Sequence, residues 1–360
     1  MTGTQRVRRW CLEAASVVAL LAVVSLASAN DGTACNRQVK PGENIASILN
    51  GLPQDDSHQT VCFDAGEFRL DGMLHLERSN VTLRGAGPAA TTLRLQEGVS
   101  SPVLVLGDIH HQEPDMTIRN VTVEDLAIRG RANAGEEFSE ERPYLSNSAL
   151  IVRRGENIDI TDLDIRDCRS ACVLTEYHSS DVSIADNVIA GAKWDGISLN
   201  RAGTTRIVGN IIRDNVAAGI TVEYLENSEI ANNVITDNGS HGLYLADAEH
   251  NRFADNRISG NAEAGVYLTC SIRSRDPVLC WDNSFSRDNE FINNRFEKNR
   301  FGYQVAVDKA ANCLNDENPP NISRNDSFLA SPNHEPEWET YGRCIAYDGS
   351  RTLQQVSSGD

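Results

Sequence analysis

Aromatic residues are scarce in this chain of 360 residues, which contains only 6 % Phe, Trp and Tyr although 40 % of its residues are hydrophobic. A domain of this length usually packs large apolar side chains around one centre, so the composition favours a thin core of Ile, Val and Leu. The hydrophobic fraction is too high for a disordered chain. The sequence therefore predicts a folded protein whose core holds few rings.

Basic residues are also in deficit. The chain has 33 Lys and Arg against 51 Asp and Glu, which gives a formal net charge of −18. A protein of this charge repels polyanions, so we expect no nucleic-acid partner.

The first 29 residues have the order of a secretory signal peptide. Arg6, Arg8 and Arg9 precede an apolar run at residues 14–26, and residues 27–29, Ala-Ser-Ala, form a small-residue cleavage site. The run is short for a membrane span, so we expect a secreted or periplasmic protein with no membrane contact after cleavage; an uncleaved anchor is the alternative. Cleavage removes three Arg and Glu13 and changes the formal charge to −20.

Eight cysteines remain after Cys11 leaves with the signal peptide, and an even number in an exported chain indicates disulfides. A four-cysteine metal site is the alternative, but no Cys-X-X-Cys pair is present, so we expect no bound metal. Proximity in the sequence suggests the pairs Cys270–Cys280 across a local excursion, Cys313–Cys344 at the tail, Cys35–Cys62 at the start and Cys168–Cys172 around a turn.

A period of 23 residues runs through the middle of the chain. It separates four asparagines and, independently, four glycines: Asn187, Asn210, Asn233 and Asn256, and Gly196, Gly219, Gly242 and Gly265. Each unit contains short alternating β segments joined by Asn and Gly turns, which is typical of a parallel β-solenoid. We expect the asparagines to stack ~4.8 Å apart in a ladder, with Ile and Val filling the interior.

Two insertions and two ends interrupt this period. Loops are expected at residues 131–146 and around Cys270 and Cys280, while Ile45, Ile48, Leu49 and Leu52 have the spacing of an amphipathic helix that could plug the first coil. The predicted order is a signal peptide at 1–29, an N-terminal cap at 30–58, a β-helix at 59–307 and a covering tail at 308–360. We expect a monomer.

The opening coils, from residues 39–42 through 61–68 to 81–87, together with the repeats, resemble the right-handed parallel β-helix, or pectate-lyase-like, superfamily over residues 38–307. The resemblance implies an all-β, right-handed parallel β-helix solenoid. This superfamily includes polysaccharide lyases, hydrolases, epimerases and non-enzymatic surface proteins, so the resemblance is specific for the fold and open for the activity.

Alternate residues of the Gly-led strands point outward and are expected to form one polar face for an extended polysaccharide. The second residue after each glycine, or its equivalent, gives the column Leu174, Ser198, Thr221, Tyr244, Tyr267 and Gln304. The side chains expected to bind substrate on this face or beside it are Glu176, Tyr177, Lys193, Asn200, Glu223, Tyr224, Asp247 and Tyr267.

A uronate-containing polymer would be attacked by removal of the proton α to its carboxylate. This chemistry requires a base, an acid and a group that neutralises the carboxylate. His241 is the first candidate base and His178 the alternative; the acid is Tyr244 or Tyr267, and the neutralising group is Arg201 or Lys193.

The segments Trp194-Asp195-Gly196 and Ser240-His241-Gly242 resemble the Asp-Gly and His-Gly positions of mannuronan C5-epimerases, which implies a catalytic role for Asp195 and His241. The Asp-Pro-His-Asp/Glu segment of those enzymes is absent from this chain.

Two alternatives stand beside lyase or epimerase chemistry. Glu176 and Glu223 are expected two coils apart, ~9.6 Å between backbones, near the upper end of the carboxylate spacing in inverting glycoside hydrolases. A non-catalytic glycan-binding surface or accessory protein would use the same face. No cofactor is required, although Ca²⁺ could bridge an acidic groove to a polyuronate.

Overall fold

The computed structural model describes residues 34–133, 135–275, 278–281, 284, 286–306, 320–334, 344–349 and 351–353. The chain divides into two units, Met1–Ala34 and Cys35–Asp360, and the fold below is that of the second unit. The predicted signal peptide lies outside the described residues.

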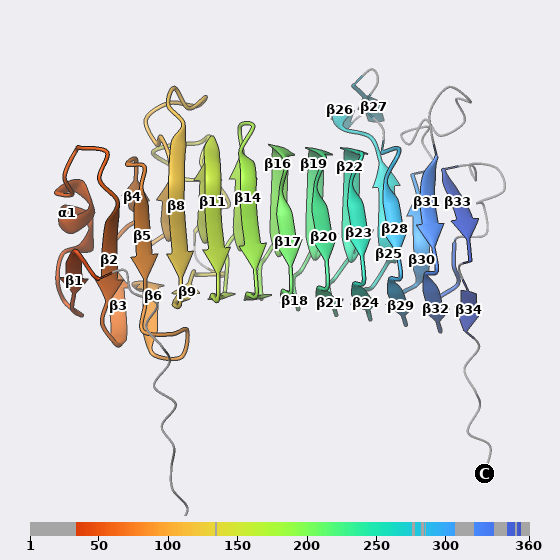
Figure 1. Ribbon diagram of the computed structural model, residues 1–360, viewed down its shortest axis with the longest axis horizontal. Helices are drawn as coiled ribbons and strands as arrows, with labels where there is room; N and C mark the ends of the chain where they lie inside the picture. The colour runs from red at the N-terminus through yellow and green to blue at the C-terminus, as the bar shows by residue number, and fades with distance from the viewer. Residues whose placement is uncertain are drawn as a thin grey trace, which may run out of the picture. The chain divides into compact units, whose positions relative to one another are not determined.

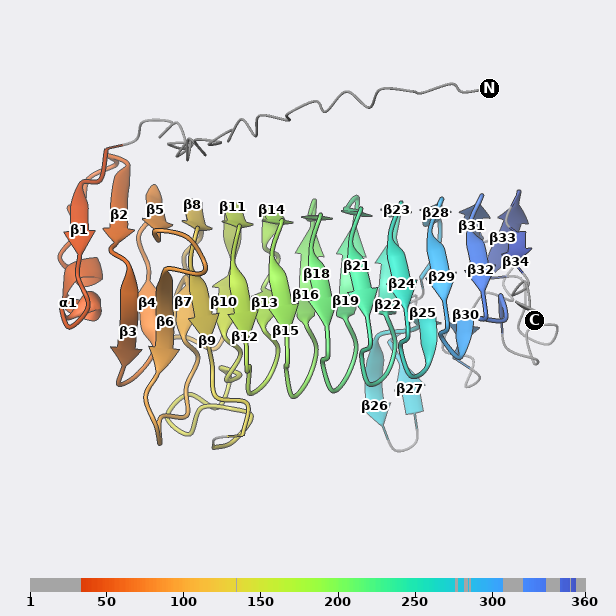
Figure 2. The same cartoon turned by 90° about the horizontal axis from the view of Figure 1, so that it is seen from below.

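The second unit is a parallel β-helix whose coils contribute strands to three columns (Figures 1 and 2). The first two columns form one sheet of 21 strands, and the third forms a sheet of 11 strands. The first column comprises β4 (Leu74–Leu76), β7 (Leu104–Leu106), β10 (Leu150–Arg153), β13 (Val173–Glu176), β16 (Ile197–Gly203), β19 (Ile220–Glu226), β22 (Leu243–Glu249), β25 (Ala264–Thr269) and β30 (Phe301–Val305).

The other two columns complete each coil. The second column comprises β1 (Arg37–Val39), β2 (Gln59–Phe63), β5 (Val81–Arg84), β8 (Ile118–Glu124), β11 (Gly155–Thr161), β14 (Ser180–Ala185), β17 (Arg206–Val208), β20 (Glu229–Ala231), β23 (Arg252–Ala254), β28 (Glu290–Ile292), β31 (Asn321–Arg324) and β33 (Ile345–Asp348). The third comprises β3 (Gly66–Leu70), β6 (Thr91–Leu95), β9 (Ala127–Arg129), β12 (Asp164–Arg166), β15 (Val188–Ala190), β18 (Ile211–Arg213), β21 (Val234–Thr236), β24 (Arg257–Ser259), β29 (Arg295–Glu297), β32 (Ser327–Leu329) and β34 (Arg351–Leu353).

The predicted alternation and 23-residue register are confirmed. In β16, Ile197 and Leu199 are fully buried whereas Ser198 between them is only partly buried. Ile197 pairs in parallel with Ile220, which pairs with Leu243 in the next coil. Stacked aliphatic side chains therefore fill a narrow interior, which explains the low aromatic content.

The predicted asparagine ladder is confirmed and extends beyond the four predicted members. The Oδ1 atom of Asn210 accepts from the backbone N–H and the Nδ2 of Asn187, each at 3.0 Å, and Asn210 Nδ2 donates to Asn233 Oδ1 at 3.0 Å. Two further ladders, at other corners of the coil, were not predicted. They run through Asn215, Asn238, Asn261 and Asn299, and through Asn251, Asn289 and Asn321.

The predicted N-terminal helix is present as α1 (Ile45–Asn50) and lies beside β1 and β2 at the end of the stack (Figure 1). Asn44 caps it by accepting from the backbone N–H of Ser47 at 2.9 Å. Ile45 and Leu49 are buried. Among the described residues, no helix is long and apolar enough to cross a membrane.

The stack is longer than expected at both ends. Before residue 59, β1 pairs with β2, and after residue 307, β31 pairs with β33 and β32 with β34. Few residues of the short strands at these ends follow the 23-residue period, so the period alone does not predict these strands.

Three of the four suggested disulfides are present: Cys35–Cys62, Cys168–Cys172 and Cys270–Cys280. Cys344 is also disulfide-bonded, and its suggested partner Cys313 lies outside the described residues. The Cys270–Cys280 bridge closes the base of the second predicted insertion, an antiparallel hairpin of β26 (Ile272–Arg275) and β27 (Val278–Cys280). Figure 2 shows this hairpin projecting from the stack beside β25.

Candidate functional site

The outward column on the first sheet has the expected order. Ser198 pairs with Leu174 and Thr221, Thr221 with Tyr244, and Tyr244 with Tyr267. The column ends with Gln304, which pairs with Tyr267. The face that the sequence predicted is therefore continuous across six coils.

A cleft of about 540 Å³ opens along β16, β19 and β22 on this side of the stack. Its lining combines six of the predicted site residues with three residues of the second insertion. The lining residues are His178, Asn200, Arg201, Glu223, Tyr224, Asp247, Ser271, Ile272 and Trp281.

The backbone directs three of these side chains into one row. Arg201, Tyr224 and Asp247 occupy the same position in successive coils and have left-handed φ values of 52°, 74° and 61°. Non-glycine residues seldom adopt this conformation. The local change of direction therefore falls within β16, β19 and β22, and all three side chains line the cleft.

The hairpin supplies the wall of the cleft that sequence reasoning missed. Trp281 is 56 % exposed, and the guanidinium of Arg273 lies 5.8 Å from its ring centroid. An exposed indole next to polar groups is a common way to hold the apolar face of a ligand. The sequence located the insertion, but nothing in it indicated the direction in which the hairpin folds.

The acidic and tyrosine residues of the cleft form local hydrogen bonds. Asn200 Nδ2 donates to Glu223 Oε2 at 3.2 Å, and the Tyr224 hydroxyl donates to Glu226 Oε1 at 2.8 Å. The bond to Glu226 raises the pKa of Tyr224 to about 12. Tyr224 is therefore a neutral hydrogen-bonding group at physiological pH.

Glu176 and Tyr177 lie outside the cleft, around a buried arginine. Arg153 is fully buried and its Nε donates to Glu176 Oε1 at 2.5 Å. The ring of Tyr177 packs over the same guanidinium at 5.2 Å. Burial raises the pKa of Glu176 although Arg153 opposes this effect. Glu176 is therefore engaged with Arg153. Of the two carboxylates considered for hydrolysis, Glu176 and Glu223, only Glu223 lines the cleft.

His241, Tyr244 and Tyr267 form an aromatic cluster that does not line the cleft. The imidazole stacks on the Tyr267 ring with centroids 4.5 Å apart, and the Tyr244 ring lies 6.0 Å away. His241 Nδ1 accepts from the backbone N–H of Ala264 at 3.2 Å. Burial lowers the pKa of His241 to about 4, so the ring is neutral at pH 7.

Asp195 holds the equivalent position two coils earlier and makes an equivalent bond. Its Oδ1 accepts from the backbone N–H of Ala218 at 3.0 Å, and its buried Oδ2 has no hydrogen-bond partner of normal geometry among the described residues. Burial raises the pKa of Asp195 to about 7, against the hydrogen bonds from Ala218 and the Thr221 side chain. Lys193, two residues before Asp195, is exposed and does not line the cleft.

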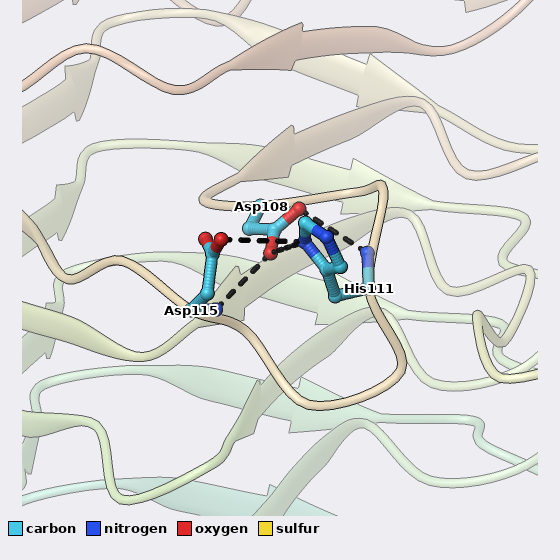
Figure 3. Close-up of side chains that lie close together, drawn as sticks. All are labelled: Asp108, His111 and Asp115. Carbon is cyan, nitrogen blue, oxygen red and sulfur yellow. Dashed lines mark hydrogen bonds and ion pairs between the residues drawn. The ribbon is translucent and has the colours of Figure 1, made fainter.

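A separate group of possible metal ligands lies in the loop between β7 and β8 (Figure 3). The side chains of Asp108, His111 and Asp115 point toward one another, and their ligating atoms lie within 4.8 Å of each other. Sequence reasoning missed this group because the ligands are three and four residues apart in a segment with no helical or strand period.

A comparison with protein-family models matches residues 117–325 to the family described as "Periplasmic copper-binding protein (NosD)". No curated protein sequence matches the chain.

Solved structures share this fold at low sequence identity. Geobacillus virus E2 ORF18 has a TM-score of 0.60 and 11 % identity, with 88 % of this chain and 60 % of that chain covered. This chain thus spans less than two thirds of that protein. Pectate lyase Pel9A has a TM-score of 0.61 and 12 % identity over 89 % of this chain and 82 % of that chain. The Yersinia enterocolitica family 28 exopolygalacturonase has a TM-score of 0.51 and 11 % identity over 90 % of this chain and 79 % of that chain.

Proposed function

We propose that this chain, which belongs to the family described as periplasmic copper-binding protein (NosD), is an exported β-helix protein that binds an extended polysaccharide and acts on it. The observation that carries the proposal is the cleft, where Trp281 and Tyr224 provide apolar ring faces beside the cation of Arg201. Such rings suit the faces of pyranose sugars, and the polar groups between them suit hydroxyls and carboxylates. Pectate lyase Pel9A and the exopolygalacturonase, by their names, act on polymers of this class.

We place the reaction at His178 and Arg201. The Arg201 guanidinium would pair with the uronate carboxylate and stabilise the negative charge that develops on it when the adjacent C–H bond breaks. His178 would take that proton as general base, the role that histidine fills more often than any other side chain in enzymes. In a lyase reaction the electron pair then expels the glycosidic oxygen, which takes a proton from water in the open cleft.

We propose different roles for the other candidate residues. His241 Nδ1 accepts a hydrogen bond from the backbone N–H of Ala264. If that nitrogen were protonated, two N–H donors would face each other and the hydrogen bond would be lost. Asp195 caps Ala218 in the same way. We therefore propose that these two residues shape the face and that Tyr244 and Tyr267 support His241, without proton transfer to substrate.

Binding without turnover is the second candidate function. It is favoured by the two carboxylates of the cleft, Glu223 and Asp247, because they repel a polyuronate and tolerate a neutral glycan. The Trp281 ring could stack on a sugar of either ligand, the polyuronate or the neutral glycan.

Incubation of the mature protein with a panel of uronate-containing polymers tests the proposal. We expect an increase in the absorbance of the double bond formed by elimination, or a change in sugar epimer composition. His178→Asn should reduce the rate by about 100-fold or more. Asn tolerates the left-handed φ of 59° at this position. The matched control is His250→Asn, since His250 is also exposed and has a φ of 56°, and it lies outside the cleft lining.

Three outcomes separate the two candidates. Turnover that is lost in His178→Asn and kept in His250→Asn supports the enzyme. Saturable glycan binding with no product from any polymer supports the binding protein and rejects the enzyme. Absence of both binding and product rejects the proposed function as a whole.

A further inference from the structure

We propose a second site, independent of the glycan cleft, in which Asp108, His111 and Asp115 bind a divalent first-row transition-metal ion, with Cu²⁺ the best-matched ion. Asp108 Oδ2 and His111 Nδ1 are 2.7 Å apart, and His111 Nδ1 and Asp115 Oδ2 are 3.7 Å apart. Ligands bound at about 2.0–2.2 Å from one ion are separated by at most roughly twice that distance. A small rotation of the exposed side chains would bring all three atoms around one ion.

The loop that carries these ligands is held in place without a metal. Asp108 is buried, and its carboxylate accepts from the backbone N–H groups of His110, His111 and Asp115. Beneath the loop, the buried guanidinium of Arg153 donates to the carbonyl oxygens of Asp108, His111 and Gln112. A ligand site supported in this way loses little conformational entropy when it binds an ion.

Access to the proposed ion comes from the solvent side. The side chains of His111 and Asp115 are 57 % and 67 % exposed, whereas Asp108 at the base is 3 % exposed. The three residues would supply one nitrogen and two oxygen ligands and leave positions open for water or for a ligand from a partner protein.

A second pair of potential ligands lies next to this loop. His110 Nε2 is 3.3 Å from Glu77 Oε1, and the ring of His75 is 6.5 Å from that of His110. Three of the eight histidines in the sequence therefore lie in one patch, with carboxylates beside them. This concentration of donors favours capture of a metal ion from dilute solution.

The donor chemistry identifies the class of ion. Ca²⁺ and Mg²⁺ take oxygen ligands, so the imidazole in this set argues against either of those ions at this loop. A mixed nitrogen and oxygen set suits Cu²⁺, which also stands highest in the affinity order of the divalent series. The segment that matches the copper-binding family begins at residue 117, after these three ligands, so the choice of Cu²⁺ rests on the donor set.

Titration of the tag-free, metal-free mature protein with Cu²⁺ tests the site by calorimetry and electron paramagnetic resonance. We expect one tightly bound equivalent with nitrogen hyperfine coupling from imidazole, and no heat with Ca²⁺. His111→Ala and Asp115→Asn should each weaken binding at least tenfold. Asp115→Asn keeps the backbone N–H that Asp108 accepts, so it should fold even if His111→Ala does not.

The matched control is His250→Asn, because His250 lies 3.2 Å from the Asp288 carboxylate and 4.0 Å from that of Glu249 but, within the described part of the chain, belongs to no three-ligand group. Its binding of Cu²⁺ should equal that of the wild type. The proposal is overturned if the wild type binds no Cu²⁺ at micromolar concentration, or if Asp115→Asn and His250→Asn bind it equally. Neither result depends on glycan binding or turnover.

Discussion

Two buried titratable residues beside the proposed glycan-binding face, Asp195 and His241, make the same kind of hydrogen bond. Each accepts a hydrogen bond from the backbone N–H of the residue one coil further on, Ala218 and Ala264. Burial disfavours the charged form of both side chains, so it raises the pKa of Asp195 to about 7 and lowers that of His241 to about 4. At neutral pH their effects on stability differ, because only Asp195 is then substantially ionised.

Asp195→Asn should stabilise the protein increasingly as the pH rises. The folded pKa is about 7 against an ordinary 3.8, so the unfolded state loses its proton first and this group destabilises the fold as pH rises from about 4 to 7. Asn keeps an oxygen acceptor for Ala218 and carries no charge. We expect its advantage over the wild type in urea unfolding to grow by about 2 kcal/mol between pH 5 and pH 8.

Asp181→Asn is the control for this measurement, since Asp181 is exposed and has a left-handed φ of 52° that Asn also tolerates. Its difference from the wild type should not change with pH. An advantage of Asp195→Asn that is equal at pH 5 and pH 8 would show that Asp195 is already ionised in the fold at pH 5.

At the residue scale, the sequence predicts the positions of Asp195 and His241 in the repeat but not their protonation states. The 46-residue separation of Asp195 and His241 placed both at the same corner of the coil. Their pKa values depend on how deeply the corner is buried and on nearby charges, and one such charge, that of Glu137, comes from the first insertion and raises the pKa of Asp195. An insertion without a period gives no indication of where it packs.

The asparagine ladder is the element that links one coil to the next. Asn210 is fully buried, and besides its bonds to the neighbouring ladder residues it donates to the Ile184 carbonyl at 2.8 Å. Removal of the amide would deprive the buried backbone N–H of Asn187 of its acceptor and the Ile184 carbonyl of this donor. The ladder therefore fixes the spacing of the coils as well as their direction.

Asn210→Ala should lower the free energy of unfolding by about 3 kcal/mol, because buried donors and acceptors lose their partners. The measurement is the midpoint of urea unfolding followed by circular dichroism. Asn200→Ala, on the exposed face with one bond to Glu223, should change the stability by less than about 0.5 kcal/mol. Equal effects of the two substitutions would contradict a structural role for the ladder.

The inserted elements show the limit of prediction from a repeat. The strands follow from alternation and a fixed period, so their faces could be predicted before the structure was known. The hairpin β26–β27 and the loop after β7 have neither, and each supplies residues of a proposed site, Trp281 in one and His111 in the other. Their packing depends on contacts between residues distant in the sequence, which a single period does not specify.

At the scale of the whole molecule, the β-helix acts as a rigid support for two chemically different loops. Repetition of the coil leaves the core nearly uniform, and the residues that could bind ligands lie where the coil is interrupted or turns. The net charge of −18, or −20 after the predicted cleavage, makes the location of each cation important. Arg201 lies in the cleft, which is where a polymer carrying carboxylates would need it.

The most direct test of the proposed function is a crystal structure of the mature protein with a bound uronate oligosaccharide. We predict one sugar ring stacked on Trp281, a carboxylate paired with the Arg201 guanidinium, and the adjacent C–H bond facing His178. An oligosaccharide bound to another face of the β-helix, with the cleft containing only water, would contradict the account.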